Sequence, residues 1–91
     1  MKWLEIVKLQ VAEIDMESVK HQLLELMSKV DYNGGLCDVK VYHNALVDND
    51  LSIHLYWKTG KVEPQGSATG LCLIHLLKTF GLTSHSVWIE Q

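Results

Sequence analysis

The segment Trp3–Ala12 is rich in β-branched and aliphatic residues, which favour extended strands. Its apolar side chains fall on both alternating sets of positions, with Leu4 and Ile6 on one set and Val7 and Leu9 on the other. A strand with apolar side chains on both faces is covered on both sides. The pattern therefore predicts a central strand of a sheet.

A narrow apolar stripe with helical spacing follows this strand, and polar residues occupy the opposite side of the same segment. The stripe consists of Met16, Val19, Leu23, Leu26, Met27 and Val30. We expect Asp15 to cap the start of this helix, because its carboxylate accepts from the first free helical N–H groups. Asn33-Gly34-Gly35 is expected to end the helix, because glycine tolerates the left-handed conformation found there.

Two alternating segments, Val39–Val47 and Leu51–Trp57, come next and are separated by Asp48-Asn49-Asp50. These three residues favour a tight turn, so the two segments are predicted to form an antiparallel hairpin.

A second helix and a last strand complete the chain. Ser67 is the predicted N-cap of the helix, and Gly81 is its predicted end. Between them the apolar arc consists of Leu73, Ile74, Leu76, Leu77 and Phe80. Ser84–Glu90 alternates and is predicted to be the final strand.

The element order strand–helix–strand–strand–helix–strand is that of the ferredoxin-like α+β fold. Right-handed crossovers then give an antiparallel sheet in the order 4-1-3-2, with both helices on one face. This order agrees with the central position expected for the first strand. The 91 residues suit a single domain spanning positions 1–91.

The alternation assigns the two faces of the sheet. One face carries the aliphatic residues of the hairpin and last strand and is expected to hold the helices. The opposite set consists of Lys40, Tyr42, Asn44, Ser52, His54, Tyr56, Ser86, Trp88 and Glu90. Large rings among polar side chains suggest a surface that contacts a partner. The alternative is an ordinary solvated face, because tyrosine and tryptophan suit strands in any setting.

Charge and hydropathy narrow the function classes. The net charge is −3, the chain has no arginine, and no basic run is present, which argues against nucleic acid and against an anionic membrane surface. Glu5 and Lys8 interrupt any signal-peptide core, and no apolar run approaches the ~20 residues of a membrane span. We therefore expect a cytoplasmic protein.

Candidate chemical groups are sparse. The five histidines show no HxH or HExxH spacing, and His43 and His54 fall on opposite sides of the hairpin. We therefore expect no metal site, and no haem motif or dinucleotide fingerprint indicates a cofactor. Gly66-Ser67-Ala68-Thr69-Gly70 opens the second helix, where free N–H groups can hold an anion, although a simple N-cap role for Ser67 is the plainer interpretation.

The chain resembles the dimeric α/β-barrel superfamily, which includes the antibiotic-biosynthesis monooxygenase-like proteins. The resemblance rests on the central strand Trp3–Ala12, the hairpin around Asp48-Asn49-Asp50 and the closing strand Ser84–Glu90. It implies a homodimer in which two sheets face each other with the helices outside. Small monooxygenases of this group use Asn, Trp and His or Tyr near a pocket between sheet and helices, for which the nearest candidates are Asn44, Trp57, His43 and His75.

Together these observations favour a homodimer that binds an apolar or aromatic small molecule, with cofactor-independent oxidation as the chemistry that the resemblance implies. Asn44, His54, Tyr56 and Trp57 are the expected ligand contacts, and Tyr42, Tyr56 and Trp88 are the expected dimer contacts. The alternative is a non-enzymatic ligand-sensing or assembly module that uses the same face for subunit contact. An enzyme requires a closed cavity with converging polar groups, whereas an assembly module requires only a packed interface.

Overall fold

The computed structural model describes residues 2–12, 16–58 and 61–91. Its elements follow the predicted order. They are β1 (Trp3–Val11), α1 (Met16–Ser28), the short 3-10 helix η1 (Asn33–Gly35), β2 (Leu36–His43), β3 (Asp50–Trp57), α2 (Ala68–Leu77) and β4 (Gly81–Ile89).

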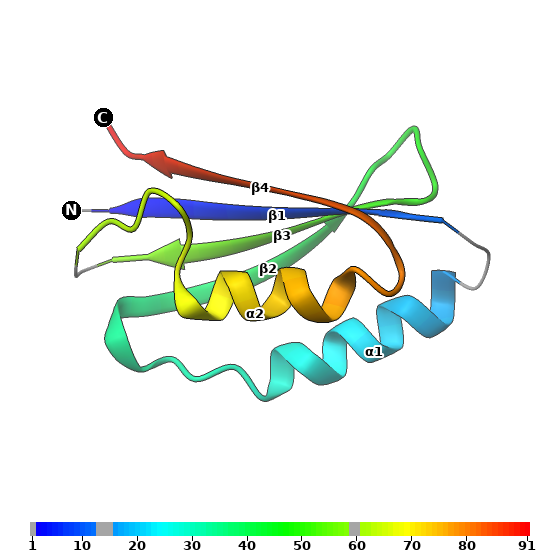
Figure 1. Ribbon diagram of the computed structural model, residues 1–91, viewed down its shortest axis with the longest axis horizontal. Helices are drawn as coiled ribbons and strands as arrows, with labels where there is room; N and C mark the ends of the chain where they lie inside the picture. Colours follow the sequence, from blue (N-terminus) through cyan, green and yellow to red (C-terminus); the bar gives the residue numbers. More distant parts are fainter. Residues whose placement is uncertain (1, 13–15, 59–60) are drawn as a thin grey trace.

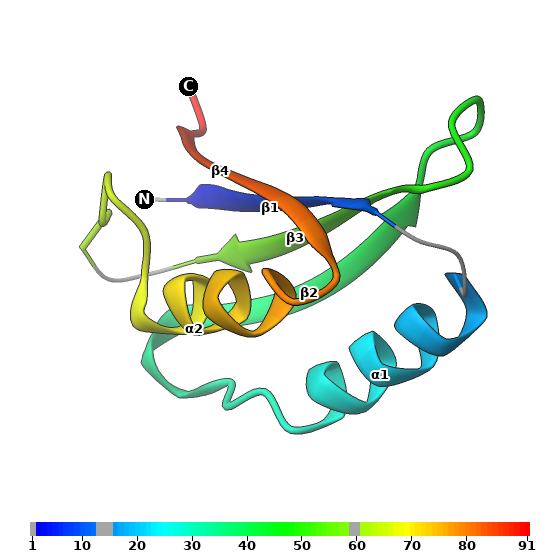
Figure 2. The same cartoon turned by 45° about the vertical axis from the view of Figure 1, so that its right-hand side comes forward.

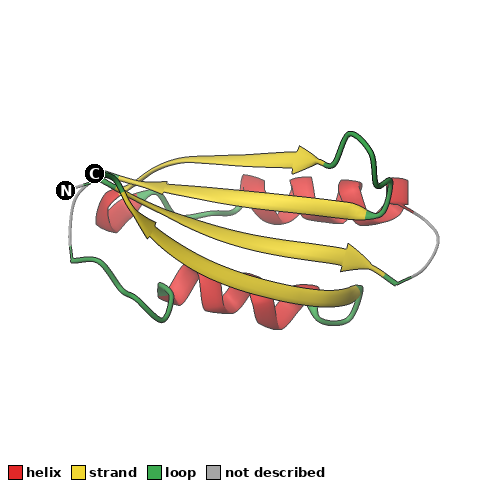
Figure 3. Cartoon of the chain, turned by 90° about the horizontal axis from the view of Figure 1, so that it is seen from above, coloured by secondary structure: helices red, strands yellow, loops and turns green. Residues whose placement is uncertain are grey.

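The four strands form one antiparallel sheet in the order β2-β3-β1-β4, which confirms the predicted topology. β1 is central, because it pairs with β3 on one side and with β4 on the other. Both helices lie on the same face of the sheet (Figure 1). Viewed from above, the sheet lies in front of both helices, and no helix covers the near face (Figure 3).

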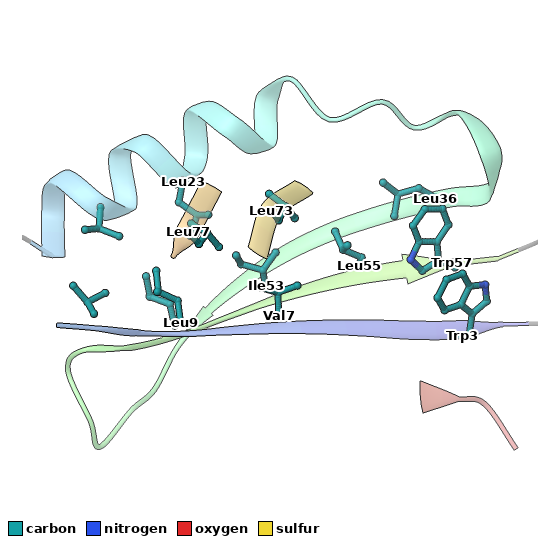
Figure 4. Close-up of a cluster of buried hydrophobic side chains, with 13 residues drawn as sticks. Trp3, Val7, Leu9, Leu23, Leu36, Ile53, Leu55, Trp57, Leu73 and Leu77 are labelled. Carbon is teal, nitrogen blue, oxygen red and sulfur yellow. The ribbon is translucent and has the colours of Figure 1, made fainter. Parts of the chain in front are cut away.

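The space between sheet and helices is filled by apolar side chains (Figure 4). Leu23 of α1 and Leu77 of α2 are buried against Ile53 of β3. At one end of the sheet the rings of Trp3 and Trp57 stack, with centroids 5.0 Å apart and planes 11° from parallel. The predicted assignment of the helix-bearing face is therefore confirmed.

α1 ends earlier than the sequence predicted. Its last residue is Ser28, whose hydroxyl donates to the carbonyl of Glu25 (2.6 Å), and Val30 lies beyond the helix. The following amides bond only three residues back, Lys29 to Leu26 and Val30 to Met27, so the helical ladder stops before the glycines. The predicted cap Asp15 lies outside the described residues.

The hairpin also differs from the prediction, because β2 ends at His43 rather than Val47. The side-chain oxygen of Asn44 accepts from the amides of Leu46 (2.8 Å) and Val47 (3.1 Å), which bends the chain into a loop. The turn therefore begins at Asn44 and not at Asp48. This connection projects beyond the end of the sheet (Figure 2).

The start of α2 agrees with the prediction, since the Ser67 hydroxyl accepts from the amide of Gly70 (2.9 Å). β4 begins at Gly81, three residues before the predicted Ser84. Gly81 pairs with Val11, and a Cβ at this position would overlap the carbonyl of Gln10. Glycine at this position therefore allows the first residue of β4 to approach the backbone of β1 closely.

Both helices are short, with 13 residues in α1 and 10 in α2. A helix needs about 20 apolar residues to cross a bilayer. Across residues 2–12, 16–58 and 61–91, no helix has the length and hydrophobicity for such a crossing.

Candidate functional site

The sheet face opposite the helices, here named the open face, carries rows of side chains that cross the strands. Leu4 of β1 lies opposite Tyr56 of β3 and opposite Trp88 of β4, and Tyr56 lies opposite Asp38 of β2. The next row, in the same strand order from β2 to β4, is Lys40, His54, Ile6 and Ser86. Leu4 and Ile6 are only half-buried, and Trp88 is 58% exposed. The open face thus presents an apolar centre with rings on both sides.

Aromatic rings of β2 and β3 form a cluster on this face. The ring of His54 lies 4.6 Å from that of Tyr42 and 6.2 Å from that of Tyr56, measured between centroids. The two tyrosine hydroxyls are 3.3 Å apart and share a hydrogen bond. The ammonium of Lys40 lies 5.7 Å from the centre of the Tyr56 ring, a cation–π geometry.

The cluster changes the acidity of two of its members. The hydrogen bond from Tyr42 raises the pKa of Tyr56, and partial burial and the nearby charge of Asp38 act in the same direction. Partial burial lowers the pKa of His54, and the positive charge of Lys8 lowers it further. At neutral pH the face therefore holds a neutral phenol and a neutral imidazole.

Two hollows lie at opposite ends of the open face. The first, named the Trp88 hollow, has a volume of about 590 Å³ and is lined in part by Lys2, Leu4, Lys40, Tyr56, Lys58 and Trp88. The second, named the Asn44 hollow, has a volume of about 490 Å³ and is lined in part by Gln10, Tyr42, Asn44, Asp50 and Leu82. Both are large enough for a small organic molecule.

The structure divides the four predicted ligand contacts between these hollows. Asn44 lines the Asn44 hollow and Tyr56 lines the Trp88 hollow. Trp57 borders the Trp88 hollow, but its indole lies on the helix side of the sheet, where it donates to Glu5. His54 lies in the row between them and shares a hydrogen bond with Ser52 (2.8 Å). The predicted dimer contacts, Tyr42, Tyr56 and Trp88, all lie on the open face.

The four residues suggested by the family resemblance do not converge. Trp57 is buried at the end of the sheet opposite the β2–β3 loop, and Asn44 and His43 bond within that loop, with His43 donating to the carbonyl of Asp48 (2.6 Å). His75 is exposed on α2. His43 and Asn44 line the Asn44 hollow, Trp57 borders the Trp88 hollow, and His75 lines a third hollow beside the two helices, so the four lie at three separate places.

A buried charged group, Glu5, lies on the helix side of β1 and was not singled out by the sequence pattern. Its side chain is fully buried and accepts four hydrogen bonds. Oε1 accepts from the Trp57 indole (3.2 Å) and the Ser67 hydroxyl (2.6 Å), and Oε2 accepts from the Ser67 amide (2.9 Å) and His85 Nε2 (2.6 Å). These donors come from β3, β4 and the start of α2, so one carboxylate joins four elements.

Two glycines make room for this network. A Cβ on Gly70 would overlap the carboxylate of Glu5, and a Cβ on Gly66, whose φ is +107°, would overlap the ring of His85. The carboxylate therefore occupies the N-terminus of α2, where the helix dipole favours negative charge. The anion site considered for Gly66–Gly70 is filled by the chain's own Glu5.

The sequence contained a signal for the contact between Glu5 and His85. Glu5 shares the inward set of β1 positions with Trp3 and Val7, and His85 shares the inward set of β4 positions with Val87. An acid and a histidine on the buried sides of two strands each need a hydrogen-bond partner, and each can serve as the partner of the other. The two strands are neighbours only in the folded sheet order, so spacing along the chain does not reveal the contact.

Metal-ligating side chains do not cluster in the part of the chain that the structure describes. No group of three His, Cys, Asp or Glu residues there could hold an ion. Cys37 and Cys72 are both exposed free thiols, and the Cys37 thiol donates to the carbonyl of Tyr56 (3.2 Å).

Three solved structures share this fold over nearly the whole chain. A conserved protein from Methanosarcina mazei Go1 matches 100% of this chain and 94% of its own, with 17% identity and a TM-score of 0.76. Rv0793 from Mycobacterium tuberculosis matches 100% and 96%, with 11% identity and a TM-score of 0.73. SnoaB, a cofactor-independent oxygenase from Streptomyces nogalater, matches 99% and 93%, with 12% identity and a TM-score of 0.66.

The matches confirm that the chain has the ferredoxin-like fold of the dimeric α/β-barrel proteins. Identities of 11–17% establish the fold alone and carry no chemistry from one protein to another. No protein-family model and no curated protein matches the sequence.

Replacing Glu5 by glutamine tests the buried network. The amide keeps the shape of the side chain but turns an N–H₂ group toward donors, so we expect Glu5→Gln to lower the free energy of unfolding by about 3 kcal/mol. Urea denaturation measures this change. The matched control is Glu17→Gln on α1, an exposed residue 3.8 Å from Lys20, which should cost ~0.5 kcal/mol or less. Equal effects of the two changes would contradict the structural role of Glu5.

The lowered pKa of His54 leads to a second prediction, which concerns the pH dependence of stability. The unfolded chain binds this proton more readily than the folded chain, so the contribution of His54 to stability is full above about pH 6.5 and is lost as pH falls below that value. An NMR titration of the His54 ring should give a midpoint below about 6.5. Lys8→Gln should raise that midpoint only in part, because burial is the larger cause. A midpoint at or above the ordinary histidine value would contradict this account.

Proposed function

We propose that the chain forms a homodimer through its open face and binds a small aromatic molecule in the Trp88 hollow. The observation that carries this proposal is the row Tyr56, Leu4 and Trp88, which places two rings and an aliphatic side chain across neighbouring strands on an uncovered sheet. Flat aromatic surface beside aliphatic surface suits an aromatic guest and a subunit contact alike.

The filled helix side supports the choice of the open face. Trp3 and Trp57 stack, and Glu5 uses its four hydrogen bonds inside the protein. A ligand between sheet and helices would have to displace these contacts. In the Trp88 hollow, a ligand needs only to replace water.

A second sheet laid on the open face would convert the Trp88 hollow from an open depression into an enclosed cavity. Enclosure removes water and strengthens electrostatic contacts with a bound molecule. The site would then be incomplete without the second copy of the chain, which links the dimer to ligand binding.

The chemistry that we propose for the enclosed site is cofactor-independent oxidation of a phenol-like substrate by dioxygen, in which one oxygen atom enters the aromatic ring to give a quinone and the other leaves as water. The pair of hydroxyls on Tyr42 and Tyr56 supports it, because one O–H of the pair donates to the other and the second O–H is left to donate to an oxyanion forming on the substrate. The fold shared with SnoaB is consistent with this chemistry at the level of architecture.

A non-enzymatic assembly module is the second candidate function. It is favoured by the way polar groups on the open face bond to one another, as between Tyr42 and Tyr56 and between the Trp88 indole and Ser86 (2.9 Å). Groups that are already paired can pack against a second sheet without a ligand. A dimer that binds no aromatic compound would favour this candidate.

Light scattering tests the homodimer directly. At micromolar concentration the chain should show twice its own mass, and Tyr56→Lys should shift it to the monomer, because burying an unpaired ammonium in an interface costs several kcal/mol. The matched control is Tyr32→Lys, since Tyr32 is 50% exposed in the segment between α1 and β2. That variant should keep the wild-type mass.

A monomer mass for the wild-type chain across this concentration range would contradict the dimer. So would a Tyr56→Lys variant that folds and retains the dimer mass. Far-ultraviolet circular dichroism of both variants verifies that each lysine substitution leaves the fold intact.

A further inference from the structure

The β2–β3 loop, residues 44–49, rises on the side of the sheet opposite the helices (Figures 1 and 2). It starts at the end of the open face that holds the Asn44 hollow. Hydrogen bonds tie the loop to β1, since Asn49 Nδ2 donates to the carbonyl of Val11 (3.2 Å) and the amide of Val11 donates to the carbonyl of Asn49 (2.8 Å). The loop is therefore a bonded projection that stands beside the open face.

Leu46 lies in the middle of this loop and is 93% exposed, the largest exposed fraction among the large apolar residues that the structure describes. Its neighbour Val47 is 41% exposed. A lone exposed leucine needs no explanation in general. Leu46 is different, because the side-chain oxygen of Asn44 accepts from its amide and fixes it on a projection beside an uncovered sheet face. Its side chain contributes to stability only when a partner buries it.

An apolar surface that fits this leucine lies at the other end of the open face. Leu4, Tyr56 and Trp88 form one row across three strands there and line the Trp88 hollow. Trp88 is 58% exposed in the single chain, so part of this surface is open to water. The loop and the hollow lie at opposite ends of one face in a molecule 38 Å long, so the loop of a chain does not cover its own hollow.

The two ends of the open face also differ in charge. Lys2, Lys40 and Lys58 line the Trp88 hollow, together with the acids Asp38 and Glu90. Lys40 and Asp38 approach each other (4.0 Å), so two lysines remain against one acid at this end.

The end that carries the loop has the opposite balance. Asp48 lies in the loop, and Asp50 lines the Asn44 hollow together with Lys8. Neither carboxylate forms an ion pair with another residue in the described ranges. If like ends of two chains met, acids would face acids, whereas the meeting of opposite ends brings the acidic loop to the lysines. A two-fold axis that crosses the strands at the middle of the open face makes both such contacts at once.

We propose that the β2–β3 loop of each protomer covers the open end of the Trp88 hollow of its partner. Leu46 packs against Leu4 and Trp88 of the partner subunit, and Asp48 approaches Lys58 of the partner subunit. Leu46 is then part of the roof of the ligand site, which a single chain cannot complete. The charge contacts beside this apolar contact determine which end of one sheet meets which end of the other.

This inference rests on the proposed homodimer and adds to it the orientation of the two sheets and a residue that the second chain contributes to the site. Charge reversal on each side of the contact tests it. Asp48→Lys and Lys58→Glu should each raise the dissociation constant of the dimer about tenfold or more, because like charges then meet in both copies of the contact. In an equimolar mixture of the two variants, the reversed charges attract across one contact and the native charges attract across the other.

Native mass spectrometry of this mixture, with one variant labelled with ¹⁵N, separates the heterodimer from the two homodimers. We expect more heterodimer than random exchange gives. The matched control uses Lys78→Glu, at the end of α2 and outside the hollow, in place of Lys58→Glu, and its mixture with Asp48→Lys should show random exchange. Random exchange in the first mixture, from a wild-type chain that forms a dimer, would overturn the inference and leave the homodimer standing. A monomeric wild-type chain would overturn both.

Leu46→Ser tests the apolar contact without changing a charge. It should raise the dissociation constant about a hundredfold, because two leucines leave the interface of each dimer and the burial of each contributes about tenfold. Leu24→Ser, at a 63% exposed position of α1, should leave the constant unchanged. A constant for Leu46→Ser equal to that of the wild-type chain would overturn the inference.

The aromatic probe 1-naphthoate tests whether the loop belongs to the ligand site. At protein concentrations where Leu46→Ser is still a dimer, its affinity for naphthoate should be about tenfold below that of the wild-type dimer, because part of the apolar roof is missing. Equal affinities in the two dimers would contradict the assignment of Leu46 to the site. Naphthoate that binds neither dimer would contradict the ligand part of the proposed function and leave the loop contact standing.

Discussion

The carboxylate of Glu5 is the interaction on which the rest of this structure depends. It is fully buried and takes donors from β3, β4 and the N-cap of α2, so it fixes how the second helix sits on the sheet. A buried ion without partners would be very costly, and four hydrogen bonds and a helix N-terminus offset that cost here. Gly66 and Gly70 follow from it, because any side chain at either position would meet the network.

The same network decides which side of the sheet is available for function. With Glu5 satisfied, Trp57 committed and the aliphatic core filled, the helix side is closed to a guest. The other side carries Leu4, Tyr56 and Trp88 in one row with no helix over them. Because one face of the sheet is filled and the other is uncovered, the same uncovered face would serve both dimerisation and ligand binding, and the two are therefore proposed together.

Alternation and helical spacing were sufficient to predict the elements and the helix-bearing face, because each depends on a local pattern repeated over several residues. The sheet order followed from the handedness of the crossovers, and the capping role of Ser67 followed from its residue type at the start of the second helix. The ends of the elements were less predictable: β2 stops at His43 because of two hydrogen bonds to the Asn44 side chain, a contact that the alternation to Val47 conceals. The pairing of Glu5 with His85 joins positions 80 residues apart and depends on β4 lying beside β1. The Trp3 indole N–H has no hydrogen-bond partner in the described part of the chain, and the sequence could not predict this, because the surroundings of the ring form only when the chain folds.

The central claim is that the open face, and not the space beneath the helices, receives the ligand. Isotope-filtered nuclear Overhauser measurements between unlabelled 1-naphthoate and the ¹³C-labelled chain locate the bound molecule most directly. The account predicts contacts from naphthoate protons to Leu4, Tyr56 and Trp88. Contacts to Leu55, Leu73 and Leu77, which are buried between sheet and helices, would contradict it.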